Sequence, residues 1–164
     1  MSGPLRPIMP GYLPHVLGQL MNLLNYWLID HLRPLDMTPQ QFRVLQVLAA
    51  KKVANIGELS RDVVVEQSVI SRIVDQLEEK GYAFRKRRAL NARIVDVRPT
   101  PQGNEALRAI EPHARAIVAE TMRVLSKREA EHLIEMMERM YRHLGADRRV
   151  LTSRPLLQAP TRSA

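Results

Sequence analysis

Cysteine is absent from the 164 residues of this chain, and aromatic residues make up only 4% of them. The lack of thiols excludes a disulfide framework, a thiolate metal site, and a cysteine that acts as a nucleophile or redox switch. It also fits a reducing compartment, so we expect a cytoplasmic protein. Because aromatic side chains are scarce, the core must come mainly from the aliphatic side chains and Met, which dominate the 45% apolar content.

Catalytic and metal-binding motifs are missing as well. The chain has no glycine-rich phosphate loop, no nucleophile elbow and no zinc-protease motif. We therefore expect neither an enzyme nor a protein with a cofactor. The histidines form no close His-x-x-x-His pair, which argues against a metal site; they are His15, His31, His113, His132 and His143.

The charge balance points toward a polyanionic partner. Lys and Arg number 25 against 17 Asp and Glu, a net charge of +8. Nucleic acid and an anionic membrane surface both suit such a charge, and a solvated basic surface gives the same count. No membrane span is expected, because the one long apolar stretch, Leu13 to Leu32, is interrupted by polar residues that include His15, Asn22, Asn25, Asp30 and His31. The N-terminus also lacks the pattern of a secretion signal.

Hydrophobic periodicity and capping signals predict a mainly α-helical chain with a small β-hairpin. Thr38 and Asn55 each precede a helix and have Gln or Glu three residues later, which is the pattern of a capping box. Gly81 and Gly145 are expected to end two helices, and Pro112 to kink or interrupt another. The expected helices cover residues 13–32, 38–51, 55–63, 66–80, 100–125 and 126–145, and the expected strands cover Tyr82–Arg87 and Arg93–Arg98.

The order of two short helices, a tight connection between them and a following hairpin is typical of a helix-turn-helix with a wing. The second helix of such a pair is presented to the DNA major groove. Here that helix covers residues 66–80, and its polar side chains lie opposite its apolar stripe. Gln pairs well with adenine, Arg with guanine, and Ser with bases or phosphates. The candidate reading residues are therefore Gln67, Ser68, Ser71 and Arg72, although an ordinary capped surface helix has a similar composition.

The hairpin concentrates positive charge at Arg85, Lys86, Arg87, Arg88 and Arg93. Like charges on facing strands oppose pairing, so folding alone gives no reason to gather them. Phosphate neutralisation does give one, and an Arg at the tip can enter a narrow minor groove. A hairpin, unlike an amphipathic helix, favours nucleic acid over a membrane surface. The remaining alternative is a wing that is merely solvated.

Residues 67–81, followed by a hairpin and Thr100-Pro101-Gln102-Gly103, resemble the MarR family of bacterial transcription regulators. The resemblance extends from about Tyr12 to Leu144. The family carries an Asp-x-Arg signature in its wing, where this chain has Asn91-Ala92-Arg93. Arg93 thus resembles the minor-groove residue of the family. The missing Asp removes a charge that usually orients a nearby Arg.

The resemblance implies a homodimer whose first, fifth and sixth helices interlock and whose winged lobes bind double-stranded DNA sequence-specifically. The over-apolar helix 13–32 agrees with this, because one small lobe cannot bury all of its faces. Two-fold symmetry then predicts a near-palindromic operator. The expected divisions are residues 1–35, an arm and dimerisation helix; 36–100, the winged lobe; 101–146, further dimerisation helices; and 147–164, a flexible tail.

The resemblance also implies control by a small aromatic or phenolic effector, an acid or a thioester, in a cleft lined by the first, second and fifth helices. The cleft candidates are Asn22, Tyr26, Trp27, His31 and Arg43, with Arg43 suited to a carboxylate. Aromatic residues such as Tyr26 and Trp27 are more often found in a core or dimer interface, a histidine near a helix end is more often a surface residue, and an arginine such as Arg43 more often faces solvent or an ion-pair partner. The expected function is a repressor that the effector releases from DNA. The alternatives are a DNA-binding module without ligand control and a transcription activator.

Overall fold

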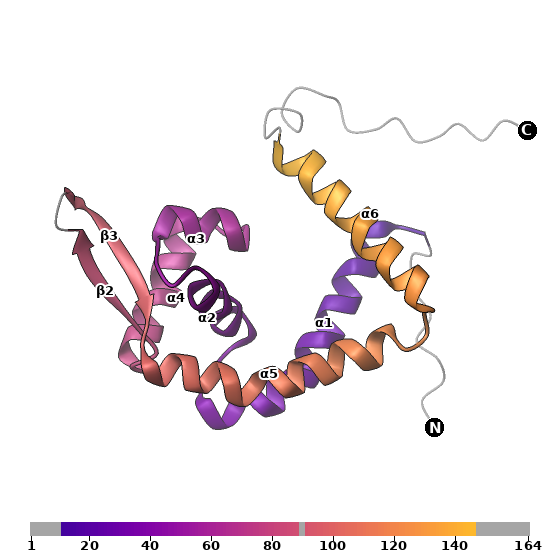
Figure 1. The fold of residues 1–164 in the computed structure, drawn as a ribbon, viewed down its shortest axis with the longest axis horizontal. Coiled ribbons are helices and arrows are strands. Elements are labelled where there is room, and N and C mark those ends of the chain that lie inside the picture. The colour runs from indigo at the N-terminus through magenta and orange to yellow at the C-terminus, as the bar shows by residue number, and fades with distance from the viewer. Residues whose placement is uncertain (1–10, 89–90, 147–164) are drawn as a thin grey trace, which may run out of the picture. The chain divides into compact units, whose positions relative to one another are not determined.

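The structure, a computed structural model, describes residues 11–88 and 91–146, without the side chains of residues 91–94 and 146. The expected arm at 1–10 and tail at 147–164 therefore lie outside the described residues. The elements are α1 Leu13–Leu32, the short 3-10 helix η1 Arg33–Leu35, α2 Pro39–Lys51, β1 Ala54–Asn55, α3 Ile56–Val63, α4 Gln67–Glu79, β2 Ala83–Arg88, β3 Asn91–Pro99, α5 Pro101–Met122 and α6 Lys127–Ala146 (Figure 1). The prediction of a mainly α-helical winged helix-turn-helix is confirmed.

Both capping boxes form as the sequence predicts. At the start of α2, the Gln41 backbone N–H donates to Thr38 Oγ1 at 3.2 Å and the Thr38 N–H donates to Gln41 Oε1 at 2.9 Å. At the start of α3, Asn55 and Glu58 make the same reciprocal pair at 2.9 and 2.8 Å. Each box satisfies N–H groups that the first turn of a helix leaves without an intrahelical acceptor. These local bonds fix where the two helices begin.

A third strand was not foreseen. The sheet has the order β1-β3-β2 and is antiparallel throughout, so β3 is the central strand. The two-residue strand β1 pairs through Ala54 with Val97 and through Asn55 with Asp96. In the hairpin, Ala83 pairs with Pro99 and the ladder continues outward. Strand β1 directly precedes α3, so it attaches the start of the helix-turn-helix to the wing.

The core lies between the helix-turn-helix, the base of the sheet and the first half of α5. Leu45 and Leu48 of α2, Leu59 of α3 and Val74 and Leu77 of α4 are fully buried there. It is largely aliphatic, as the low aromatic content requires: among the described residues, the buried aromatic side chains are Phe42 and Tyr82. Helix α1 contributes one buried residue, Leu32 at its C-terminal end.

The expected interruption at Pro112 and the expected helix end at Gly145 were wrong, while the alternative of a kink at Pro112 stays a prediction. Helix α5 runs from Pro101 to Met122 as one element, so Pro112 does not interrupt it. Helix α6 continues to Ala146, so Gly145 lies inside it and not after its end. Gly81, in contrast, has φ = +71°, the left-handed conformation expected of a glycine that ends a helix. A glycine near the end of an apolar stripe is a weak signal unless a hydrogen-bonded turn follows it.

The chain divides after Ala119 into two compact units. The first holds α1 to α4, the sheet and most of α5. The second begins at Glu120 and holds α6, whose start is capped by Ser126 and Glu129. Hydrogen bonds from Ser126 hold the pKa of Glu129 below its usual value. Large apolar side chains of α6 remain exposed within the chain, among them Ile134, Met140 and Leu144.

Close packing at the start of α5 makes Gly103 intolerant of a side chain. A Cβ at this position would overlap the backbone carbonyl oxygen of Tyr82. We expect Gly103→Ala to lower the free energy of unfolding by about 1–3 kcal/mol, because the backbone must move to relieve the overlap. Urea denaturation measures the loss. Glu105→Ala, an exposed position on the same helix, is the control and should stay within about 0.5 kcal/mol of the wild type.

Candidate nucleic-acid interface

Helix α4 presents the polar face that the sequence predicts. Gln67, Ser68 and Arg72 are exposed and Ser71 is half-buried. The opposite face carries Ile70, Ile73, Val74 and Leu77, which are all buried in the core. The N-terminal half of the helix is therefore held from behind by apolar packing while its polar side chains face solvent. This is the arrangement that a helix needs to enter a major groove.

The turn between α3 and α4 is tight and strained. Val64 closes it with φ = +59°, a left-handed conformation that costs a β-branched residue roughly 1–2 kcal/mol. The Val65 N–H donates to the Ser60 carbonyl at 3.0 Å, and the Ser60 hydroxyl donates to the Val65 carbonyl at 2.6 Å. These two bonds fix the angle between the paired helices.

Arg85 turns toward α4 and not toward solvent. Its Nη1 lies 2.5 Å from Asp75 Oδ1 and is also paired with the Glu78 carboxylate, while its Nη2 donates to the Ser71 carbonyl at 3.2 Å. The Arg85 backbone N–H donates to Glu78 as well. The sequence grouped Arg85 with the phosphate-binding cations, but its side chain is only 25% exposed and joins the wing to the reading helix. The acceptors Asp75 and Glu78 were missed.

Arg88 is also paired within the chain. Its Nε and Nη2 donate to the two carboxylate oxygens of Asp96 at 3.2 and 2.6 Å. These hydrogen bonds hold the pKa of Asp96 below its usual value, although burial of the carboxyl opposes the shift. Asp96 therefore stays ionised at neutral pH, and the stability it provides is lost only as the pH falls through that lowered pKa.

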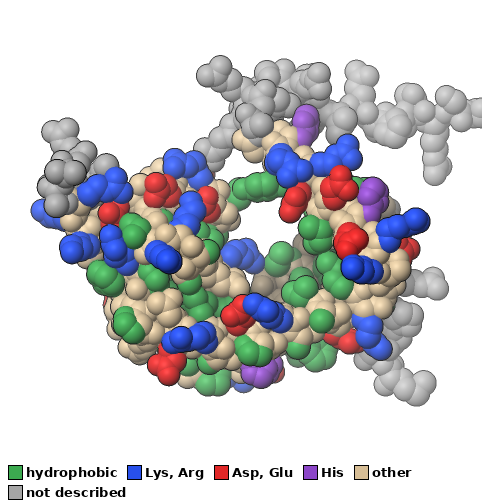
Figure 2. Space-filling model, viewed as in Figure 1, with side chains coloured by type: hydrophobic (Ala, Val, Ile, Leu, Met, Phe, Trp, Pro, Cys, Tyr) green, Lys and Arg blue, Asp and Glu red, His purple; other side chains and the backbone are tan. Residues whose placement is uncertain are grey.

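Lys86, Arg87 and Arg98 are the exposed cations of the hairpin, in the described part of the chain, that have no carboxylate within ion-pair distance. Basic side chains gather over the hairpin of β2 and β3 at the left of Figure 2. The Arg93 side chain lies outside the described residues. The charge that the sequence predicts on the wing is present, but two of its cations are already engaged by carboxylates.

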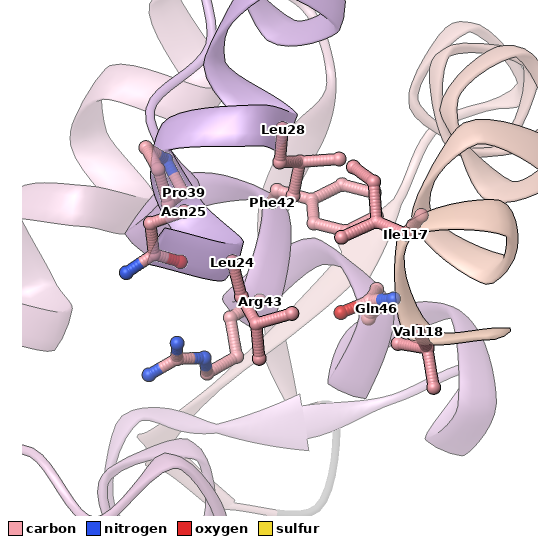
Figure 3. A pocket seen from close by; sticks show the side chains of 10 residues that line it. Leu24, Asn25, Leu28, Pro39, Phe42, Arg43, Gln46, Ile117 and Val118 are labelled. Carbon is pink, nitrogen blue, oxygen red and sulfur yellow. The ribbon is translucent and has the colours of Figure 1, made fainter. Parts of the chain in front are cut away.

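A pocket of about 190 Å³ lies between α1, α2 and α5. Figure 3 shows Phe42 packed near Leu28 and Ile117. The residues lining the pocket are Leu24, Asn25, Leu28, Pro39, Phe42, Arg43, Gln46, Ala114, Ile117 and Val118. The three helices that line it are those that the family resemblance implies.

Only Arg43 of the five cleft candidates lines this pocket. Tyr26 and Trp27 are 69% and 64% exposed and contact each other edge-to-face at 6.3 Å. His31 stacks on His113 of α5, with ring centroids 3.9 Å apart. Asn22 is exposed and does not line the pocket. The polar residues that do line it beside Arg43, Asn25 and Gln46, were missed because the prediction favoured aromatic side chains over position on the helix face.

The described residues contain neither a membrane-spanning helix nor a cluster of metal ligands. No helix there is long and apolar enough to cross a membrane. No group of three or more His, Asp or Glu side chains in that part of the chain is placed to hold a metal ion.

Residues 37–95 match the sequence model of the MarR family. MhqR, an HTH-type transcriptional regulator of Bacillus subtilis, is 27% identical over 125 residues, which are 76% of this chain and 86% of that protein. An uncharacterised HTH-type transcriptional regulator of Bacillus cereus is 30% identical over 123 residues, which are 74% of this chain and 82% of the relative.

Solved structures share the fold. A MarR-family regulator from Silicibacter pomeroyi superposes with a TM-score of 0.72 and 28% identity, covering 82% of this chain and 90% of that one. A mutant MarR of E. coli, crystallised with operator DNA, superposes with a TM-score of 0.72 and 23% identity, covering 85% of this chain and 99% of that one. BpsR of Bordetella bronchiseptica, whose DNA binding is regulated by 6-hydroxynicotinic acid, superposes with a TM-score of 0.73 and 18% identity. The match covers 85% of this chain and 98% of that one.

The Arg85 pairs predict a measurable coupling between the wing and α4. We expect Arg85→Gln to lower the free energy of unfolding by about 1–3 kcal/mol, because the half-buried Glu78 and the exposed Asp75 lose the cation that they share. Chemical denaturation measures the change. Arg87→Gln removes an exposed cation from the same strand and should alter stability by no more than about 0.5 kcal/mol. Equal effects of the two substitutions would contradict the structural role of Arg85.

Proposed function

Because the chain belongs to the MarR family and is a DNA-binding transcription regulator, not an enzyme, we propose that it is a homodimeric repressor of a near-palindromic operator. In this proposal residues 36–100 are the DNA-binding lobe, and α1, α5 and α6 form the dimer. The protein acts in the bacterial cytoplasm, where it associates with the nucleoid. An aromatic or phenolic acid or thioester releases it from the operator.

The polar face of α4 carries this proposal. Its exposed Gln67, Ser68 and Arg72 are held from behind by a rigid core, and an exposed Lys86 and Arg87 stand on the adjacent hairpin. Polar side chains on such a helix read base edges in the major groove, and exposed Lys and Arg side chains on the hairpin neutralise phosphates. One lobe thus supplies both parts of a sequence-specific interface, and a dimer supplies two copies related by symmetry.

Unburied apolar surface supports the dimer. Along α1, large apolar side chains remain exposed in the single chain: Leu13, Val16, Leu17, Leu20, Met21, Leu23 and Ile29. The exposed residues of α6 add to them. Contiguous apolar surface of this kind marks a protein–protein interface in a soluble protein. A second copy of the chain is the partner that a two-fold-symmetric operator requires.

The pocket beside Arg43 supports the effector. Its wall is largely apolar, and the Asn25 amide and the Arg43 guanidinium both belong to its lining (Figure 3). An aromatic ring fits the apolar part, and a carboxylate suits the guanidinium. The neighbour that responds to 6-hydroxynicotinic acid, an aromatic acid, has the same fold. Because the pocket lies between α1 and α2, a bound molecule would favour one distance between the DNA-binding lobe and the proposed dimer helix α1.

The reading role of α4 predicts loss of base preference in Arg72→Ala. The wild-type protein should select, from a random-sequence duplex pool, two half-sites about one helical turn apart. Against these duplexes we expect Arg72→Ala to lose about 1–3 kcal/mol at one base pair per half-site. Lys86→Ala is the control: it should weaken all sequences alike and lower the salt slope by about 1. Unchanged specificity in Arg72→Ala would refute this assignment.

The pocket predicts a direct effector site. Calorimetry with benzoates, hydroxycinnamates and their thioesters should give binding by at least one compound, which also reduces operator binding. For a carboxylate, Arg43→Gln should cost about 1.5–3 kcal/mol of affinity, because a charged hydrogen bond is lost. Tyr26→Phe, outside the pocket, should bind the same compound as the wild type does. Silence across the whole panel would exclude this class of effector.

A further inference from the structure

The register of the wing shifts near its outer end. From Ala83–Pro99 to Arg87–Val95 the pairs of the β2–β3 ladder follow one another regularly. The next pair is Arg88 with Asn91, so residues 92–94 of β3 lie between the two pairs. The outer pair, Arg88 with Asn91, is therefore connected to the regular ladder across an irregular step. Backbone pairing alone holds this outer end of the hairpin poorly.

The Arg88–Asp96 ion pair spans this step. Arg88 lies just outside the shift, while Asp96 lies just inside it, paired in the ladder with Lys86. Arg88 Nε donates to Asp96 Oδ2 at 3.2 Å, and Arg88 Nη2 donates to Asp96 Oδ1 at 2.6 Å. The Asp96 side chain is only 10% exposed. A two-point hydrogen-bonded pair restricts orientation as well as distance. The outer strand end is thus tied to the regular ladder by a side chain.

Asp96 also adjoins the helix-turn-helix. It is the ladder partner of Asn55, the residue that caps α3 through the Glu58 N–H. Glu58 in turn acts electrostatically on Arg88, and Arg98 on Asp96. The carboxylate therefore lies where the start of α3, the central strand and the outer wing meet.

We propose that Asp96 is the positioning residue of the wing: by holding Arg88 across the register shift, it sets the outer part of β2 against DNA. In the family that the chain resembles, the aspartate of the Asp-x-Arg signature orients a nearby Arg, and this chain has Asn91 at that position. In this proposal Asp96 takes over that orienting role. Arg88 acts through Asp96 and does not contact phosphate as a free cation. The inference rests on the DNA binding of the proposed function.

Charge and positioning predict opposite effects at Asp96. Asp96→Asn removes a negative charge from a DNA-binding hairpin, so electrostatics alone would strengthen binding. If the carboxylate positions the wing, the same change weakens binding, because Arg88 loses the acceptor that holds it. The sign of the change therefore separates the two explanations without any assumption about magnitude.

The test is a double-mutant cycle with Asp96→Asn, Arg88→Gln and the double variant, on the duplex that the wild type selects from a random pool. We expect each of the three to bind on the order of tenfold more weakly than the wild type, with no further loss in the double variant. Arg87→Gln is the matched control, and its loss should add to that of Asp96→Asn. Hydroxyl-radical footprints of the cycle variants should lose protection at the flanks and keep it at the centre of each half-site.

Asp96→Asn that binds as well as or better than the wild type would overturn the proposal, as would additive effects of the two substitutions. If Asp96→Asn does not fold, the exposed Arg88 carries the test alone. At protein concentrations that give equal protection at the centre of each half-site, Arg88→Gln must lose the flanking footprint while Arg87→Gln, although it binds more weakly than the wild type, keeps it. The same footprint in both would overturn the proposal. A wild-type protein that selects no duplex would instead count against the proposed function.

Discussion

The wing, the reading helix and α5 depend on one small hydrogen-bonded junction at Thr100. The Thr100 hydroxyl donates to the Gly81 carbonyl at 2.6 Å and accepts from the Gly103 N–H at 2.9 Å, while its backbone N–H donates to the Tyr82 carbonyl at 3.0 Å. One residue thus binds the end of α4, the entrance of the hairpin and the start of α5. The left-handed Gly81 and the side-chain-free Gly103 are what allow the three segments to approach so closely.

Carboxylates govern the hairpin as much as cations do. The side chains of Arg85 and Arg88 are held by different acidic partners: Arg85 pairs with carboxylates of α4, and Arg88 pairs with Asp96 of the neighbouring strand β3. Lys86 and Arg87 keep their charge in solvent between them. A run of four cations would repel itself in a hairpin, and pairing two of them reduces that repulsion while fixing the geometry of the strand. Net charge shows that a polyanion is favoured, but the acidic residues decide which cations can meet it.

The local parts of this fold were predictable from sequence, and the tertiary ones were not. The boxes at Thr38 and Asn55 and the left-handed Gly81 depend on residues within four positions, so short-range chemistry determines them. The strand Ala54–Asn55 has only two residues and exists because β3 lies beside it. The pairing of Arg88 with Asp96 similarly requires the register of the hairpin, which no periodicity reports. In the pocket, helix geometry brings Asn25 and Gln46 to Arg43, whereas residue chemistry alone favoured Tyr26 and Trp27.

The attachment of α1 explains why a pocket at this place can control DNA binding in the function proposed above. Helix α1 is anchored to the lobe through Leu32 at its C-terminal end, its one buried residue, and the pocket contacts it at Leu24, Asn25 and Leu28. Those contacts lie one to two turns from the anchor, so in the proposed function an occupant of the pocket would press on α1 close to its attachment to the lobe. The recognition helix is packed rigidly on that core through Ile70 and Leu77, and therefore moves with it. In the proposed dimer, a small change beside Arg43 would therefore alter the separation of the two copies of α4, and a two-fold-symmetric operator is sensitive to that separation.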